Sequence, residues 1–236
     1  MKLGKVVSSL AVAIVGLAPY RASRALRRVY RPQESGARGR ARQGKVRVIT
    51  GASGGDGRVI ALECARRGAW VVLAARHREA LEIAVAERRE VSGPPAAGNA
   101  LVAMATPEQV RHLADLTWAA CRRIDVWINN AGGAFAGPTA ESPEAEMRWL
   151  LDLSVWGVIY DSRVALQVFQ RQGRGRLVNM ASITRRVAFP YTGFYSASKA
   201  LVEVYTQALR QELLHVEKSG VRVSAVCPVA VRAQLP

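Results

Sequence analysis

Residues 46–67 read VRVITGASGGDGRVIALECARR, in which clustered glycines join a short apolar run to a helical segment. The run Val46–Thr50 has the length and composition of a buried strand, and Arg58–Arg67 carries apolar residues at helical spacing. Glycines between a strand and a helix let the backbone approach a phosphate, which the N–H groups at the helix start attract. The stretch therefore predicts a nucleotide-binding loop. The residues that we expect to bind the nucleotide here are Gly51, Ser53, Gly55 and Gly57.

Short apolar runs continue to alternate with helical segments along the rest of the chain. The expected strands are Val46–Thr50, Trp70–Ala75, Ala100–Met104, Asp125–Asn129, Arg176–Met180 and Val221–Val226. The expected helices are Arg58–Arg67, Glu79–Val91, Pro107–Arg122, Pro143–Gln172 and Tyr195–Glu217. This rhythm is typical of a parallel sheet covered by helices on both faces. We therefore expect an α/β protein with a doubly wound Rossmann fold, of about six strands in the order 3-2-1-4-5-6.

The chain is strongly basic, and much of its charge lies near the N-terminus. Its formal net charge is +16, and residues 1–45 contain 11 of its 34 lysines and arginines but one of its 18 acidic residues. Residues 32–44 are rich in glycine, arginine and proline without apolar periodicity, which is typical of a linker. We expect a basic arm over residues 1–44 and one folded domain over residues 45–236.

The arm also contains an apolar run at residues 6–18. This run is shorter than the ~20 residues that span a bilayer, and arginines follow it. We expect a cytoplasmic protein in which residues 1–31 make peripheral contact with an anionic membrane, with a loosely docked helix as the alternative. No recognition motif accompanies the positive charge, so we expect no nucleic-acid partner.

The three cysteines are far apart and lie in apolar stretches, at Cys64, Cys121 and Cys227. This spacing favours buried, reduced thiols over a disulfide framework or a metal site. We therefore expect no bound metal and a reducing compartment.

The residues after the second expected strand favour NADP(H) over NAD(H). A NAD site usually places a carboxylate about 20 residues beyond the glycines, where it binds the ribose hydroxyls. Here the sequence at 74–78 reads AARHR, with Arg76 at its centre. A cation suits the 2′-phosphate of NADP(H), which an acid would repel. The alternative is a solvated basic helix start, although helix N-termini favour acidic residues.

Further motifs follow the fourth and fifth expected strands. The sequence NNAG stands at 129–132, Ser182 follows the fifth strand, and YSASK begins thirteen residues later at Tyr195 and ends at Lys199. With the glycine loop, and in this order, these motifs resemble the short-chain dehydrogenase/reductase family from about Lys45 to Pro228.

Tyr195 and Lys199 are four residues apart, so on a helix their side chains share a face. A phenol is a poor acid–base catalyst at neutral pH unless a neighbouring ammonium stabilises its phenolate. Such a pair can exchange a proton with a carbonyl oxygen, which the Ser182 hydroxyl can also bind.

The resemblance implies an oxidoreductase that moves a hydride between NADP(H) and a carbonyl or alcohol. It assigns catalysis to Ser182, Tyr195 and Lys199. The resemblance further implies that Tyr195 and Lys199 also contact the cofactor, Lys199 through the nicotinamide ribose, and that the cofactor is lined by Asn129, Ala131 and Gly132.

Some residues depart from the family pattern. Ser154 stands where the family has a catalytic asparagine, and Asp56 replaces an apolar residue in the glycine loop. The aspartate expected near the adenine is absent from residues 102–106, and the sequence ends at Pro236, before the family's substrate lid and last strand. We expect a homo-oligomer. Either another subunit covers this C-terminally short domain, or the chain is a truncated relative of the family. A non-catalytic nucleotide-binding or membrane-associated scaffold is the alternative.

Overall fold

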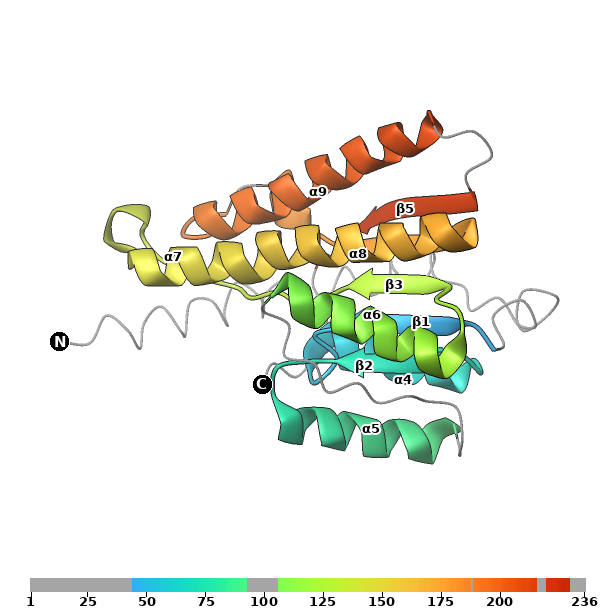
Figure 1. Cartoon of the computed structure of the whole chain (residues 1–236). Helices are drawn as coiled ribbons and strands as arrows, with labels where there is room; N and C mark the ends of the chain where they lie inside the picture. The colour runs from blue at the N-terminus through green and yellow to red at the C-terminus, as the bar shows by residue number, and fades with distance from the viewer. Residues whose placement is uncertain (1–43, 93–105, 188, 216–219, 230–236) are drawn as a thin grey trace, which may run out of the picture.

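A parallel sheet forms the centre of the part that the computed structural model describes, residues 44–92, 106–187, 189–215 and 220–229 (Figure 1). Its strands are β1 (Val46–Thr50), β2 (Trp70–Ala74), β3 (Val126–Asn129), β4 (Arg174–Met180) and β5 (Gly220–Val226). Their order is β2-β1-β3-β4-β5, and every neighbouring pair is parallel. The doubly wound parallel sheet predicted from the sequence is confirmed.

The expected third strand, Ala100–Met104, lies outside the described residues. The strands β3, β4 and β5 therefore correspond to the expected fourth, fifth and sixth strands, and their arrangement agrees with the predicted order. The expected arm up to residue 43, with its proposed membrane contact at residues 1–31, also lies outside this part.

Helices cover both faces of the sheet (Figure 1). The α-helices are α4 (Gly55–Arg66), α5 (Arg78–Ser92), α6 (Pro107–Cys121), α7 (Glu144–Leu151), α8 (Gly157–Gln172) and α9 (Gly193–Leu214). Shorter segments are η1 (Thr139–Glu141), η2 (Asp152–Trp156) and η3 (Ile183–Arg185). The helices α6, α8 and α9 pack in one core cluster, and α4 and α5 pack in another.

The two clusters explain why the strands read as continuous apolar runs. All five residues of β1 are buried, which is typical of a parallel strand covered on both faces. Trp127 and Phe169 lie on one face of the sheet, and Leu73 and Leu81 lie on the other. Each of these four side chains is at most 1% exposed. The continuous apolar runs of the strands therefore reflect a sheet that helices cover on both faces.

The expected helix Pro143–Gln172 contains a turn that the sequence did not predict. It consists of α7, the π-helical segment η2 and α8, and the backbone N–H of Gly157 bonds to the carbonyl of Asp152, five residues earlier. One extra residue in a helical turn often occurs at a functional site. This turn contains Ser154.

The expectation of buried cysteines is wrong for all three thiols. Cys64, Cys121 and Cys227 are free but only half-buried. Cys64 lies on α4, Cys121 is the last residue of α6, and Cys227 follows β5. Their apolar neighbours in the sequence do not determine how deeply each side chain is buried.

Among the residues described, no helix is long and apolar enough to cross a membrane. The same part of the chain brings together no group of three His, Cys, Asp or Glu side chains that could hold a metal ion.

Candidate active site

At two glycines of the loop between β1 and α4, a side chain would collide with neighbouring backbone atoms. Gly51 has φ +64°, and a Cβ atom there would lie 2.7 Å from the Cα atom of Ala131. A Cβ atom on Gly57 would lie 2.3 Å from the carbonyl oxygen of Gly51. Gly55 has φ +53°, which glycine adopts without strain. Close packing therefore requires glycine at Gly51 and Gly57, and the backbone conformation favours glycine at Gly55.

Residues at the end of β3 hold this loop in place. The Asn130 side-chain amide donates to the carbonyl oxygens of Thr50 and Gly51, both at 3.2 Å. The Thr50 hydroxyl accepts the backbone N–H groups of Asn130 at 3.2 Å and Ala131 at 3.1 Å. The ends of β1 and β3 are therefore tied together at the point where the chain turns into α4.

Replacing Gly57 with alanine should open this junction. The new methyl group would overlap Gly51 and lie 2.4 Å from Nδ2 of Asn130, so we expect a loss of about 1–3 kcal/mol of stability and weaker dinucleotide binding. Thermal unfolding and a binding titration would measure both. Gly193→Ala is the matched control, because its methyl group would meet nothing closer than 3.7 Å. Unchanged unfolding and binding in Gly57→Ala would contradict this view of the loop.

The helix that follows the loop starts without a side-chain cap. Its N-cap is Gly54, whose position offers no side-chain hydrogen bond to the first N–H groups of α4. Asp56 lies in the first turn, where burial raises the pKa of its carboxyl group. An anion can therefore meet uncapped N–H groups at this helix start.

Ser53 and Arg76 lie at the same edge of the sheet as the glycine loop. Ser53 is partly exposed in the turn after β1. Ala52 donates its N–H to the carbonyl of Ala74 at 3.2 Å, and Arg76, two residues beyond Ala74, is exposed to solvent. Arg76 therefore follows the strand end that is bonded to the loop.

Lys199 is a buried cation at the carboxyl edge of the sheet. Its side chain lies on α9, is 6% exposed, and donates from Nζ to the carbonyl oxygen of Met180 at 3.2 Å. Burial lowers the pKa of Lys199 to about 8. Nζ lies 5.8 Å from the centre of the Tyr195 ring, within the range of a cation–π contact. The Lys199 ammonium and the Tyr195 ring are therefore neighbours.

Ser182 follows β4 at the same edge. It is 7% exposed, and its hydroxyl accepts the backbone N–H of Thr184 at 3.2 Å, which starts the short segment η3. Because the oxygen is the acceptor in this bond, the hydroxyl proton remains available to another oxygen.

Ser154 lies close to this group rather than apart from it. A Cβ atom built on Gly132 would be 3.3 Å from Nζ of Lys199 and 3.5 Å from Oγ of Ser154. Ser154 is fully buried, and its Oγ accepts the N–H of Gly133 at 3.2 Å. The π-helical turn thus connects α8 with the backbone after β3.

Asn129 is turned toward the interior instead of the loop. Its amide donates to Oδ1 of Asn179 at 2.8 Å and to Oγ of Ser162 at 3.2 Å, and the residue is 1% exposed. These contacts join β3, β4 and α8. They leave the neighbouring Asn130 as the asparagine that touches the glycine loop.

Neither Thr50 nor Asn130 is among the site residues predicted from the sequence. In the sequence, Thr50 is only the end of the first expected strand, and Asn130 is only part of the NNAG motif. Strand alternation could have separated Asn129 from Asn130, because successive residues of a strand point to opposite faces.

Comparisons with known proteins agree with the fold and the order of these motifs. The sequence profile of the short chain dehydrogenase family matches residues 45–235. The chain therefore belongs to the short-chain dehydrogenase/reductase family, a family of oxidoreductases.

Similar curated proteins include enzymes of plants and bacteria. An 11-beta-hydroxysteroid dehydrogenase A of Sesamum indicum is 37% identical over 170 residues, which cover 72% of this chain and 48% of that protein. An uncharacterized oxidoreductase of Staphylococcus saprophyticus is 33% identical over 82% of this chain and 81% of its own length. The chain thus spans about half the length of the sesame relative.

Similar solved structures contain either nicotinamide dinucleotide. A short chain dehydrogenase/reductase from Burkholderia phymatum in complex with NAD has a TM-score of 0.76 and 31% identity, over 81% of this chain and 67% of that one. An actinorhodin polyketide ketoreductase variant with NADPH has a TM-score of 0.75 and 30% identity, over 80% of this chain and 72% of that one.

Proposed function

We propose that this protein transfers a hydride between NADP(H) and a carbonyl or alcohol substrate, using Ser182, Tyr195 and Lys199. The observation that carries the proposal is the buried ammonium of Lys199 beside the Tyr195 ring. The ammonium also adjoins Gly132, at the sheet edge that carries the glycine loop. A buried cation is costly, and such groups concentrate at functional sites.

A nicotinamide dinucleotide fits the residues at this edge. The uncapped start of α4 and the glycine loop, with Gly51, Ser53, Gly55 and Gly57, would hold the pyrophosphate. Arg76 would meet the adenosine 2′-phosphate, and Ala131 and Gly132 would line the crevice beyond the loop. Asn129 would support the cofactor site from the interior of the sheet, because its amide is bonded to Ser162 and Asn179.

The proposed chemistry divides the work among the three catalytic side chains. When bound, the reduced cofactor supplies the hydride that the carbonyl carbon receives. Tyr195 donates a proton to the carbonyl oxygen, and the Ser182 hydroxyl donates a hydrogen bond to the same oxygen. The Lys199 ammonium stabilises the phenolate that Tyr195 leaves behind. The product is an alcohol, and its oxidation follows the same steps in reverse.

The preference for NADP(H) is proposed on the charge of Arg76. Replacing Arg76 with aspartate should weaken NADPH binding by about 10–100-fold, because a charge-assisted hydrogen bond is lost and repulsion is added. Binding of NADH should improve. Titrations with both dinucleotides would measure the change in preference. Arg66→Asp, at the far end of α4, is the control and should change neither affinity. An unchanged ratio of the NADPH and NADH affinities in Arg76→Asp would contradict the role proposed for Arg76 in binding the 2′-phosphate.

We propose an apolar ketone or secondary alcohol as the substrate class. The segment between Ser182 and Tyr195 exposes Val187, Phe189 and Tyr191, which would offer apolar contact beside the catalytic hydroxyls. The name of the sesame relative, a hydroxysteroid dehydrogenase, is in keeping with this class.

The experiment that tests the function is NADPH consumption by the full chain with a panel of carbonyl compounds. The panel should contain steroid-like ketones, simple aldehydes and polar sugars. We expect consumption to be fastest with the apolar ketones. Dinucleotide binding without consumption of NADPH on any compound would favour the nucleotide-binding scaffold instead.

A further inference from the structure

The short segment η3, which follows Ser182, carries a nearly buried ion pair with helix α9. The guanidinium of Arg185, in η3, binds the carboxylate of Glu203 on α9. Their side chains are 12% and 14% exposed. The Nε atom of Arg185 also donates to Sγ of Cys227 at 2.9 Å. The Arg185 side chain therefore connects the turn after β4 both to α9 and to the residue after β5.

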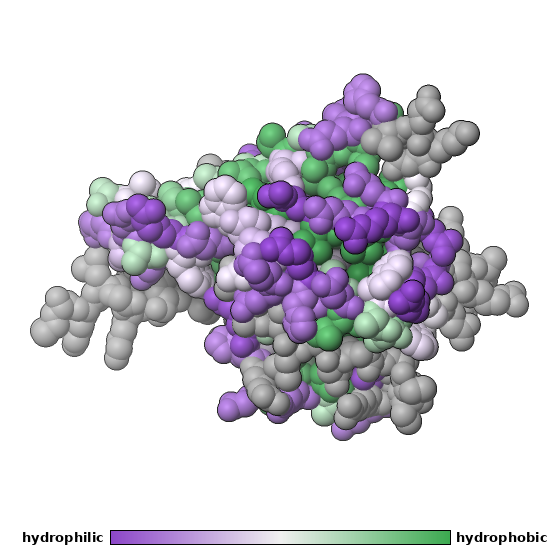
Figure 2. Space-filling model, viewed as in Figure 1, coloured by the Kyte–Doolittle hydropathy of each residue, from purple (hydrophilic) through white to green (hydrophobic). Residues whose placement is uncertain are grey.

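Helix α9 turns Glu203 inward and exposes apolar residues beside it in the sequence. Leu201 is 42% exposed and Val204 is 64% exposed. Figure 2 shows apolar surface along the upper edge of the molecule, where Figure 1 places α9. A helix normally presents its charged residues to water and its apolar residues to the core. The inward position of the Glu203 carboxylate therefore follows from its partner and not from ordinary amphipathic packing.

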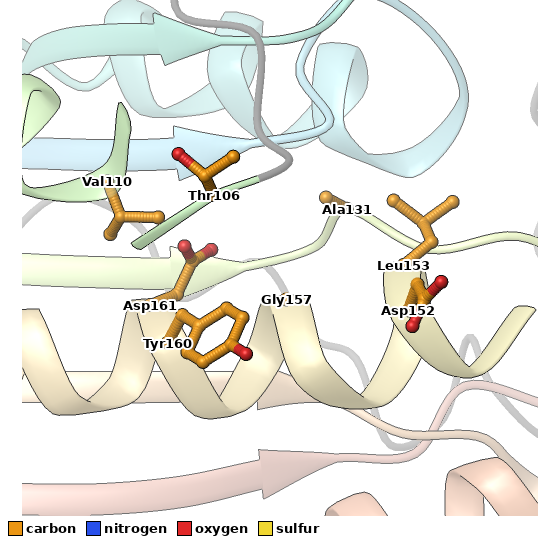
Figure 3. A pocket seen from close by; sticks show the side chains of 8 residues that line it. All are labelled: Thr106, Val110, Ala131, Asp152, Leu153, Gly157, Tyr160 and Asp161. Carbon is orange, nitrogen blue, oxygen red and sulfur yellow. The ribbon is translucent and has the colours of Figure 1, made fainter. Parts of the chain in front are cut away.

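Another buried carboxyl group, that of Asp161 on α8, lies on the other side of β3. It interacts with Thr50 at the end of β1 and borders a small cavity beside the glycine loop (Figure 3). In the described part of the chain its Oδ1 atom has no hydrogen-bond partner, and the cavity has room for about one water molecule. The carboxylate that adjoins the segment of Ser182 is thus the paired one, Glu203.

Backbone hydrogen bonds fix Ser182 relative to β5. The residues before and after Ser182 donate their N–H groups to the carbonyl oxygens of Val226 and Pro228, at 2.8 and 3.0 Å. The hydroxyl of Ser182 accepts the N–H of Thr184 at 3.2 Å. These bonds set the position of Ser182 relative to the sheet, but they do not set its position relative to Tyr195 on α9.

Side chains of α9 contact the chain on both sides of Ser182. Lys199 donates to the carbonyl oxygen of Met180, which lies two residues before Ser182. Glu203 binds Arg185, which lies three residues after Ser182. Positions 195, 199 and 203 follow one another at intervals of four residues, so they share one face of the helix. This face therefore carries the catalytic phenol, the buried ammonium and the carboxylate that binds the turn after β4.

Stability alone does not account for a buried ion pair. Desolvation offsets much of the attraction between two buried charges, and well-packed apolar side chains often replace such a pair without loss of stability. A guanidinium and a carboxylate do, however, bind each other in a defined geometry, so their contact fixes how two segments lie relative to each other. A displacement of about 1 Å at a catalytic group can cost about 10²-fold in rate.

Resting on the proposed function, we propose that Arg185 and Glu203 are positioning residues, which hold the Ser182 hydroxyl in place relative to α9. They act on the reaction through Ser182, which shares the substrate oxygen with Tyr195. The glycine loop follows β1, and β3 separates that strand from β4. The ion pair should therefore affect kcat and leave the affinity for NADPH unchanged.

The test removes both charges together, so that neither stays buried without a partner. In the full chain, Arg185→Met/Glu203→Leu should resist denaturant about as well as the wild-type protein and bind NADPH with the same dissociation constant. Its kcat with the best ketone of the panel should fall by about 10–100-fold. An unchanged kcat in the folded double variant would overturn the proposal.

A second comparison asks whether the pair acts through Ser182. Ser182→Ala alone should lower kcat. Adding Arg185→Met/Glu203→Leu to Ser182→Ala should lower it little further, because the hydroxyl that the pair positions is already absent. If the pair substitutions lower kcat as much in Ser182→Ala as in the wild-type background, the pair does not act through Ser182 and the proposal is wrong.

Two further variants complete the design. Arg186→Met is the control, because Arg186 is 69% exposed and lies 3.8 Å from Glu203; it should keep kcat. Arg185→Lys keeps a cation opposite Glu203 if the double variant does not fold. An ammonium cannot reproduce the guanidinium fork, so kcat should fall less, and again only when Ser182 is present. A wild-type protein without activity on the panel would refute the proposed function and this inference together, whereas full activity in Arg185→Lys and in the double variant would refute the inference alone.

Discussion

Replacing Tyr195 with phenylalanine is expected to lower kcat by about 10²–10⁴-fold, the range that a positioned proton donor contributes. The ring beside Lys199 remains in this variant, so the change removes the hydroxyl and little else. NADPH should bind as in the wild-type protein. The measurements are the rate of NADPH consumption with the best ketone of the panel and a dinucleotide titration.

Tyr205→Phe is the matched control for this experiment. Tyr205 lies on the same helix and is half-buried, and its ring packs against the core on one face of the sheet. We expect the control to retain kcat. Loss of activity in both variants would indicate damage to α9 rather than loss of a proton donor, and full activity in Tyr195→Phe would exclude the proposed role.

Replacing Lys199 with methionine should lower kcat strongly and yet stabilise the protein. Burial lowers the pKa of Lys199 from 10.5 to about 8. Between these pH values the unfolded chain binds more protons than the folded chain, so stability rises with pH across this window. Below about pH 8 the full cost of the buried charge is present, about 3 kcal/mol. After loss of the bond to Met180, we expect a net gain of about 2 kcal/mol at neutral pH.

Unfolding in denaturant at neutral pH would measure this gain, and the activity assay would measure the loss. Lys45→Met is the control, because Lys45 is half-exposed and pairs with Asp125 at 3.3 Å. It should keep kcat and gain no stability. A Lys199→Met protein that is less stable than the wild type would mean that the ammonium supports the fold, contrary to the functional role proposed for it.

The fold was predictable because strands and helices differ in length and in hydrophobic period. The runs at Val46–Thr50 and Val221–Val226 are β-rich and bounded by turn residues, and the structure places strands there within one residue. The π-helical turn at Ser154 could not be predicted, because one extra residue in a turn leaves the apolar pattern of α7 and α8 almost unchanged.

The spacing of the candidate site residues could be predicted from the sequence, but their contacts could not. Sequence spacing placed Tyr195 and Lys199 on one helix face, and their contact is present. The direction of Asn129 and the unpaired oxygen of Asp161 depend on which helix lies beneath β3. Such contacts between elements distant in the sequence are set by tertiary packing, which no local pattern records.

The proposed function requires that a hydride moves between the cofactor and a carbonyl carbon at the site of Lys199 and Tyr195. This transfer can be followed with NADPH that carries deuterium at both C4 positions of its nicotinamide and a ketone from the panel, with mass spectrometry of the alcohol formed. We predict one deuterium on the carbinol carbon of the product of the wild-type protein, and formation of that product by Tyr195→Phe about 10²–10⁴-fold more slowly. An alcohol without deuterium would exclude hydride transfer from the cofactor, and the same labelled alcohol at the same rate from Tyr195→Phe would exclude the proposed role of Tyr195.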